Sequence, residues 1–313
     1  MDWFEKITGF HELPYAATQR RLRVEAGHLI SDFTSARYAV GTLETPSVAE
    51  LRERAGRIRR LGKQNRIRCI QGDARRLHAD PANRGALFQV ASQFNLLEMV
   101  GPSITPGHGV SRYADDRTQG PACAIAAGAG TIFRNYLVEV GGGIGQTSAE
   151  QIDWLADLGT ARGNQRGELW LMQNGYALCS SPGLAAINSL LEAATESELA
   201  RLRGLLRIGL HWDVEVTDCS PGEQLVSQAY CSALPVAYSR VPGANWRPFA
   251  TLILEAAYEA TVLAGLLNSR RGASNQVLLT RLGGGAFGNE LPWINSAMEK
   301  ALRLVEGQGL QVD

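Results

Sequence analysis

Apolar residues recur along the chain with the two periods that distinguish strands from helices. Residues 87–92 and 277–279 are short apolar runs that predict buried strands, and residues 207–217 and 225–238, joined by a Ser-Pro-Gly turn, predict an antiparallel pair. The almost wholly apolar stretch 248–268 predicts a long buried helix. Strands and helices that alternate in this way predict a mixed α/β protein.

Two further helices are expected from capping signals. Ser47 and Glu50 have the spacing of a capping box ahead of an apolar stripe. Thr147 and Glu150 have the same spacing, which predicts a helix over about residues 149–158. Both signals supply acceptors for N–H groups that a helix start leaves unpaired.

Two other segments predict a further strand of the sheet and a helix that packs on the sheet. Residues 67–73 alternate like a strand and close on Gly72-Asp73, and the small residues from 121 to 136 predict one helix packed closely on a sheet. No repeat, low-complexity tract or clear linker divides the chain. We therefore expect an α/β domain over residues 46–313 with an insertion around 140–245, and an N-terminal extension over 1–45 packed on it.

Composition narrows the class of protein. Lys+Arg and Asp+Glu are both 31, so the overall charge favours neither nucleic acid nor an anionic membrane as a partner. The arginine-rich face over residues 52–63 has no interleaved aromatic residues and reads as a solvated helix face. No apolar run approaches the ~18 residues of a membrane span. Five scattered cysteines without a C-x-x-C pair, and no secretory leader, predict a reduced cytoplasmic protein.

A glycine-rich loop near the end of the sequence is the main candidate for ligand binding. Gly283, Gly284 and Gly285 follow the apolar run 277–279, and Pro292 opens a segment with helical spacing. Strand, glycine loop and helix is an arrangement that presents backbone N–H groups to a phosphate. A tight strand-to-helix turn is the alternative, since the loop matches neither a Walker motif nor a Rossmann fingerprint.

Three segments in this order resemble the macrodomain and poly(ADP-ribose) glycohydrolase superfamily. They are Gly72-Asp73 after residues 67–71, Asn95 after the run 87–92, and the loop from Gly283 to Asn289. The resemblance implies a three-layer, macrodomain-like mixed sheet flanked by helices. It also implies that the protein binds ADP-ribose and cleaves an ADP-ribosyl glycosidic linkage.

The resemblance further implies roles for individual residues. Asp73 would accept a hydrogen bond from the adenine amino group and Asn95 would bind a ribose. The diphosphate would lie on the loop, with Phe287 near the adenosine. We count as ligand-binding candidates Asp73, Asn95, Gln119, Gly283, Gly284, Gly285, Ala286, Phe287, Gly288 and Asn289. As alternatives, Asp73 is equally suited to cap a helix and Asn95 to form a turn.

The candidate acids follow from the chemistry of glycoside cleavage. An oxocarbenium-like transition state needs an acid at the leaving group or a positioned water. Glu98, three residues after Asn95, is the first candidate, followed by Asp116 with its neighbour Asp115. Glu150 is the third candidate. Glycohydrolases have paired glutamates after a glycine triplet, and Gly141–Gly143 followed by Glu150-Gln151 partly resembles this signature, although Gln151 stands where the second acid is expected. Glu255 and Glu259 read as a polar stripe on a buried helix.

Two other functions remain open from the sequence. One is a reader that binds ADP-ribose or a related nucleotide without turnover. The other is an unrelated hydrolase using Cys231 with His211 and Asp213, although Cys231 lies in an apolar strand. The histidines lack metal-ligand spacing, so we expect no zinc and no cofactor. The expected partner is ADP-ribose or an ADP-ribosylated substrate, with nucleic acid only as the modified substrate and no membrane.

Overall fold

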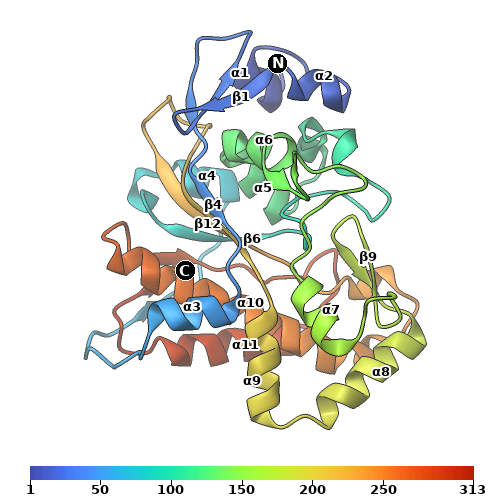
Figure 1. Cartoon of the computed structure of the whole chain (residues 1–313). Helices are drawn as coiled ribbons and strands as arrows, with labels where there is room; N and C mark the ends of the chain where they lie inside the picture. The colour runs from blue at the N-terminus through green and yellow to red at the C-terminus, as the bar shows by residue number, and fades with distance from the viewer.

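The computed structural model describes all 313 residues, and at its centre lies a seven-stranded mixed sheet (Figure 1). The strand order is β4-β11-β12-β6-β13-β14-β5. The first three strands run antiparallel to one another, and β12, β6, β13, β14 and β5 are all parallel. The strands span β4 (Thr42–Glu44), β5 (Arg66–Ile67), β6 (Leu87–Ala91), β11 (Gly209–Glu215), β12 (Leu225–Cys231), β13 (Gln276–Leu278) and β14 (Gln311–Val312).

Helices cover both faces of this sheet (Figure 1). One face is covered by α4 (Ala74–Ala79), α5 (Gln119–Ala126) and α6 (Gly128–Tyr136). The other is covered by the central helix α10 (Arg247–Arg270). Four helices of the same layer pack against α10: α3 (Val48–Ala55), α8 (Ser181–Glu192), α9 (Glu196–Leu205) and α11 (Leu291–Leu304). The expected three-layer α/β arrangement with a mixed sheet is confirmed.

Smaller elements sit at the ends of the layers. A second apolar cluster joins the N-terminal segments to α5 and α6, with Trp3, Phe4 and Ile132 among its members. The division at residue 46 stays a prediction, although β4, which precedes it, belongs to the main sheet. The smaller elements outside the main layers are α1 (Trp3–Thr8), α2 (Tyr15–Gln19), β1 (Leu22–Glu25), β2 (His28–Ser31), β3 (Tyr38–Ala39), β7 (Glu139–Val140), β8 (Gly143–Ile144), α7 (Ala156–Arg162), β9 (Leu171–Gln173) and β10 (Tyr176–Leu178).

The elements with strong apolar patterns form as expected. Strand β6 is the most central parallel strand and is buried on both faces, which explains its nearly continuous apolar sequence. The predicted antiparallel pair is β11 and β12, although β12 ends at Cys231, well before residue 238. Ser47 and Glu50 form the reciprocal capping box of α3. All of these elements contribute to one main core.

The predicted strand over residues 67–73 is wrong in extent. Only Arg66 and Ile67 pair with a neighbour, and that neighbour, β14, is itself two residues long. The next five residues are exposed and have no regular structure. Alternation alone did not distinguish a paired strand from an exposed segment at the edge of the sheet.

The single helix expected over residues 121–136 is two helices. The backbone turns at Ala127, with φ −109° and ψ 54°. Thr217 stabilises the break from outside the helices, because its N–H donates to the carbonyl of Ala126 (2.8 Å) and its hydroxyl accepts from the N–H of Gly128 (3.0 Å). A tertiary contact therefore decides where α5 ends.

The helix expected over residues 149–158 is also misplaced. Thr147 does accept hydrogen bonds from the N–H groups of Ala149 and Glu150, but the N–H of Thr147 donates to the carbonyl of Glu150. This closes a local turn, and the helix α7 begins only at Ala156. The capping spacing was therefore a turn signal here.

Helix α10 corrects the statement that no apolar run approaches the length of a membrane span. The segment Gly243–Arg270 is long and apolar enough by length and composition, but 78% of its apolar window is buried inside the protein. Its polar stripe is engaged by neighbouring helices, since Glu255 accepts from Arg203 (2.8 Å) and Glu259 from Arg52 (2.6 Å). This agrees with the sequence interpretation of the two glutamates.

Candidate functional site

The main cleft lies where the parallel strands β6, β12 and β13 end. Ligands of open α/β sheets bind at the carboxyl ends of strands, because the loops diverge there. The cleft has about 740 Å³ of empty space including its mouth. Its lining comes from the segment after β6, the start of α5, the loop after β13 and two tyrosines: 91–93, 98–100, 116, 118–121, Tyr176, 233, Tyr238, 280–283 and 285–287.

The glycine loop presents unpaired donors to this cleft. The N–H groups of Gly283, Gly285, Ala286 and Phe287 have no hydrogen-bond partner within the protein, and all four residues line the cleft. The intervening N–H of Gly284 is bonded to the carbonyl of Arg281. A run of free backbone donors in one loop is an anion-binding arrangement.

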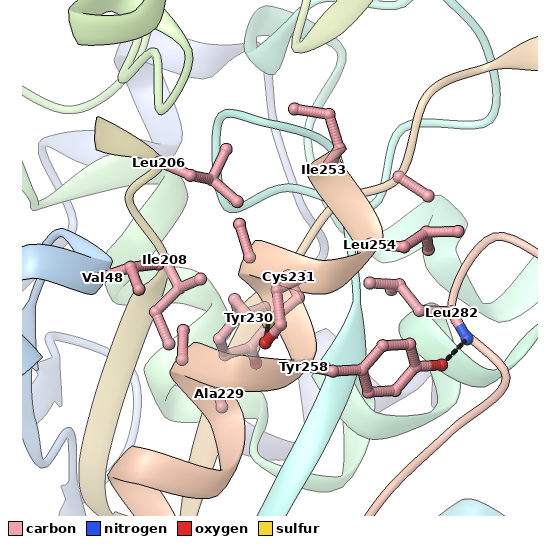
Figure 2. Packing of buried hydrophobic residues seen from close by; sticks show 14 of the residues in the cluster. Val48, Leu206, Ile208, Ala229, Tyr230, Cys231, Ile253, Leu254, Tyr258 and Leu282 are labelled. Atoms are coloured by element: carbon pink, nitrogen blue, oxygen red, sulfur yellow. Dashed lines mark hydrogen bonds between the residues drawn. The ribbon is translucent and has the colours of Figure 1, made fainter. Parts of the chain in front are cut away.

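The base of the loop is fixed from the core. The hydroxyl of Tyr258 on α10 donates to the carbonyl of Thr280 (2.6 Å) and accepts from the N–H of Leu282 (2.9 Å), the bond drawn in Figure 2. Asn289 closes the other end, because its side-chain amide donates to the carbonyl of Leu234 (2.8 Å). Gly283 has φ +71°, and a Cβ there would lie 2.5 Å from the Cβ of Ala233. The loop is therefore held in shape before any ligand arrives.

Glu98 is a buried carboxyl group that also lines the cleft. The residue is 3% exposed, and its Oε1 atom is buried without any hydrogen-bond partner. Burial raises the pKa of this carboxyl well above its usual value; Arg134 opposes the rise and Asp116 adds to it. A carboxyl group that stays protonated near neutral pH can act as a general acid.

The start of α5 comes very close to this carboxyl group. A Cβ at Gly120 would lie 2.3 Å from Oε2 of Glu98 and 2.0 Å from the carbonyl oxygen of Ala91. Only a glycine permits this approach. The wall of the cleft beside Glu98 is therefore bare helix backbone.

A network of hydrogen bonds holds the segment that carries Glu98. Leu96 adopts φ +70°, which is rare for a non-glycine residue. Gln93 accepts from the N–H of Met99 (2.6 Å), and the hydroxyl of Tyr113 accepts from the N–H of Glu98 (2.9 Å). The guanidinium of Arg134 donates to the carbonyl of Leu96 (3.3 Å). The backbone geometry at Glu98 is thus set by side chains from several elements.

Arg134 is itself buried, 1% exposed, and has no carboxylate within ion-pair distance. It lies over the ring of Tyr230, 3.9 Å from the centroid, and contacts Nδ1 of His211 at 3.0 Å. Burial, together with this guanidinium, holds the pKa of His211 well below its usual value. His211 is therefore neutral and Arg134 carries the local positive charge.

Asp116 and Gln119 line the cleft, but their side chains have partners within the protein. Asp116 accepts from the N–H of Thr118 (2.8 Å). Gln119 accepts from the N–H of Ala91 (3.0 Å) and donates to the carbonyl of Gln89 (2.8 Å). Gln119 therefore ties α5 to the end of β6, and its ligand-binding role stays a prediction.

Asp73 and Asn95 do not line the cleft. Asp73 is the N-cap of α4 and accepts from the N–H of Arg76 (3.0 Å), which confirms the capping alternative. Asn95 is fully buried; it donates to Gln151 (2.8 Å) and accepts from the N–H of Leu97 (3.2 Å). The adenine and ribose roles of these two residues stay predictions without geometric support.

The remaining candidates have other positions. Glu150 is exposed, belongs to the turn at Thr147 and does not line the cleft. Gly284, Gly288 and Asn289 belong to the loop but do not line the cleft. The Cys/His/Asp set is not assembled: His211 is paired across the sheet with Gln228, and Asp213 lies at a bulge and binds Arg271. Burial raises the pKa of the Cys231 thiol to about 12, which disfavours a nucleophilic thiolate.

Two aromatic residues of the site were missed in the sequence. Tyr176 and Tyr238 form a cluster with Phe287, with ring centroids 5.3–5.7 Å apart. Arg281 also lines the cleft, is exposed and has no ion-pair partner. Tyr176 follows the Asn174-Gly175 turn in the hairpin of β9 and β10, and nothing in the sequence places that hairpin beside the loop. No group of three or more His, Cys, Asp or Glu side chains could hold a metal ion.

Comparison with known proteins finds similarity only among solved structures. No family model matches the chain, and no curated protein matches it. Poly(ADP-ribose) glycohydrolase from Deinococcus radiodurans in complex with ADP-ribose is 14% identical; the match covers 96% of this chain and 90% of that chain, with a TM-score of 0.42. The apo form of that enzyme is 13% identical, with 97% and 89% coverage and a TM-score of 0.39. Similarity at this level of identity and overlap assigns neither a family nor a function to the chain, so its function has to be argued from its own residues.

Proposed function

We propose that the cleft binds ADP-ribose through its diphosphate and that the protein cleaves an ADP-ribosyl glycosidic linkage. One observation carries the proposal: the unpartnered carboxyl of Glu98 and the four unpaired N–H groups of the 283–287 loop face one cleft. Free backbone donors suit a diphosphate, and a buried neutral carboxyl suits a leaving group that needs a proton.

The proposed reaction divides the two tasks between the two walls. The loop would hold the diphosphate, which fixes the distal ribose relative to Glu98. The protonated Glu98 would give its proton to the leaving atom as the bond to the anomeric carbon breaks. Water would then add to that carbon, and the carboxylate of Glu98 would take a proton from this water, which restores the starting state. Asp116 is the candidate to orient the water.

Two measurements test the proposal. Calorimetry with ADP-ribose and AMP should show saturable binding of ADP-ribose that is tighter than binding of AMP, because AMP lacks the second phosphate. Release of ADP-ribose from an ADP-ribosylated protein should be lost in Glu98→Gln while ADP-ribose binding persists. The amide of glutamine keeps the size of the side chain but cannot cycle a proton.

The same measurements address the alternatives. If the wild-type chain binds ADP-ribose but releases none from the ADP-ribosylated protein, it is a reader of ADP-ribose and not an enzyme. Absence of ADP-ribose binding at high micromolar concentration would refute both functions. We also propose a cytoplasmic setting, because all five cysteines are free thiols, as is usual in a reducing compartment.

A further inference from the structure

A strongly basic segment follows α3 and ends in α4. Residues 57–76 carry eight cationic side chains and one carboxylate, a net charge of +7 in a chain whose overall charge is zero. Three of the cations have carboxylate partners: Arg60 with Glu306, Arg68 with Asp313 and Arg75 with Asp218. The other five form no ion pair: Arg57, Arg59, Lys63, Arg66 and Arg76. The segment therefore has positive charge that nothing in this chain neutralises.

This segment borders a groove on α11. In Figure 1 the light-blue chain that leaves α3 lies near the dark-red α11, and residues of both line a groove with about 1,780 Å³ of empty space including its mouth. The groove wall is fixed by hydrogen bonds, since Asn65 donates to the carbonyl of Val305 (3.0 Å) and Gln308 to that of Arg59 (2.6 Å). Ile67, Met298 and Leu302 give the groove apolar surface. The groove is thus preformed and has apolar surface among charged side chains, of which Lys63 is unpaired while Glu299 and Glu306 are paired with arginines.

The groove adjoins an open edge of the main sheet. Strand β5 is the last strand and pairs only with β14. The N–H groups of Arg66 and Arg68 donate to Leu310 and Val312, each at 2.9 Å. Because successive peptide groups of a strand point to opposite sides, the N–H and carbonyl of Ile67 face away from β14. They are available to a further strand.

We propose that the β5 edge and this groove dock an extended acidic segment of a partner protein, which adds as a strand beside β5. Main-chain hydrogen bonds to Ile67 would hold the added strand, and alternate side chains would point into the groove and toward the cations. The matching partner sequence is one in which aliphatic and acidic residues alternate. Charge complementarity with the five unpaired cations selects it.

Edge protection does not account for these features. Natural sheets protect an edge with short strands and charged residues, and both are present here. However, Leu61, Ile67 and Ile70 are 62%, 60% and 41% exposed. Exposed aliphatic side chains on an open edge promote pairing, so they point to a surface that a partner covers.

Charge and composition disfavour two other occupants. A second copy of the chain at this edge would bring the same five unpaired cations against one another, and like charges across an interface are costly. Residues 57–76 contain no aromatic side chain on which bases could stack. A protein segment with carboxylates avoids both difficulties.

The test uses the full chain and a fluorescent peptide of about eight residues, a typical strand length, in which glutamate and valine alternate. Fluorescence anisotropy should show saturable binding that weakens as salt rises from about 50 to 300 mM. A peptide of the same composition with the glutamates and valines in separate blocks should bind more weakly, because it cannot alternate its side chains along the edge.

Three variants locate the site. The set Arg59→Glu, Lys63→Glu and Arg66→Glu should weaken binding at least about tenfold, because attraction becomes repulsion. The matched set Arg20→Glu, Arg166→Glu and Arg201→Glu makes the same charge change at exposed cations elsewhere that also lack ion pairs, and should change affinity much less. Ile67→Pro removes an N–H that β14 does not use and should also weaken binding.

Several outcomes would overturn the proposal. These are no saturable binding below about 1 mM peptide, equal losses in the two charge-reversal sets, or binding that is unaffected by Ile67→Pro in a folded variant. Tighter binding of a single-stranded RNA oligonucleotide than of the peptide would assign the surface to nucleic acid instead. If Ile67→Pro fails to fold, the two charge-reversal sets still decide the location.

Discussion

Tyr258 offers the most direct test of how the glycine loop is held in shape. Its ring lies in the main core, and its hydroxyl bridges the carbonyl of Thr280 and the N–H of Leu282 (Figure 2). Replacing Tyr258 with phenylalanine removes the hydroxyl while keeping the packed ring. The variant therefore changes the hydrogen bonds at the base of the loop and little else.

The size of the effect follows from the hydrogen bonds that are lost. The N–H of Leu282 also donates to the carbonyl of Thr280 (2.8 Å), so neither group is left without a partner when the hydroxyl is removed. The loss is therefore that of ordinary hydrogen bonds, and we expect Tyr258→Phe to lower the free energy of unfolding by about 0.5–1.5 kcal/mol. If the loosened loop has to be reordered on binding, ADP-ribose affinity should fall about tenfold, equivalent to about 1.4 kcal/mol.

Urea unfolding and calorimetry with ADP-ribose measure the two effects, and Tyr136→Phe is the matched control. The Tyr136 hydroxyl donates to Glu12 (2.7 Å) in the N-terminal cluster and not to the loop. Tyr136→Phe should therefore lower stability without lowering affinity. An unchanged unfolding free energy in Tyr258→Phe, or equal losses of affinity in both variants, would refute the reasoning.

Three further predictions concern the walls of the cleft and the capping residue. Burial raises the pKa of Glu98 above the ordinary value of 4.5, so above that pH the folded protein binds a proton that the unfolded chain releases. The stability of the wild type should therefore fall relative to that of Glu98→Gln as the pH rises from about 4.5. Urea unfolding of both proteins over a range of pH checks this, and identical pH profiles would contradict it. Gly120→Ala should clash with Ala91 and Glu98 and lower the free energy of unfolding by about 1–3 kcal/mol, whereas Gly101→Ala, with open space around it, should not. Asp73→Ala should lose about 0.5–2 kcal/mol of stability as a helix cap and leave ADP-ribose affinity unchanged in calorimetry; a weakened affinity would restore the adenine role.

The sequence predicts the parts of the fold that short-range pattern determines. The β6 run, the β11–β12 pair and α10 follow from continuous or periodic apolar residues, and the loop after β13 follows from its glycines. The placement of α5 and α6 does not, because the break at Ala127 is made by Thr217, which is distant in sequence. The true extent of β5 likewise depends on β14, which pairs with it from the other end of the sequence.

The candidate site also has parts that local sequence signals predict and parts that only the folded chain brings together. The glycine loop could be found because glycines and a following helix are local signals. Glu98 could be named as a candidate acid, but its burial depends on α5, where Gly120 lies against it. Tyr176 and Tyr238 were missed because only the folded chain brings them to Phe287. Asp73 and Asn95 show the reverse case, in which a motif-like residue already has a partner within the protein.

The two ion-paired glutamates of α10 also bear on how the chain is made. A nascent segment of this length and apolarity is what the translocon tests for insertion into a membrane. A carboxylate near the middle of such a segment opposes insertion by roughly 2.5–3.5 kcal/mol on the scale for aspartate. Glu255 and Glu259 therefore do two things: they hold α10 to Arg203 and Arg52 in the finished fold, and they oppose its diversion into a lipid bilayer during synthesis.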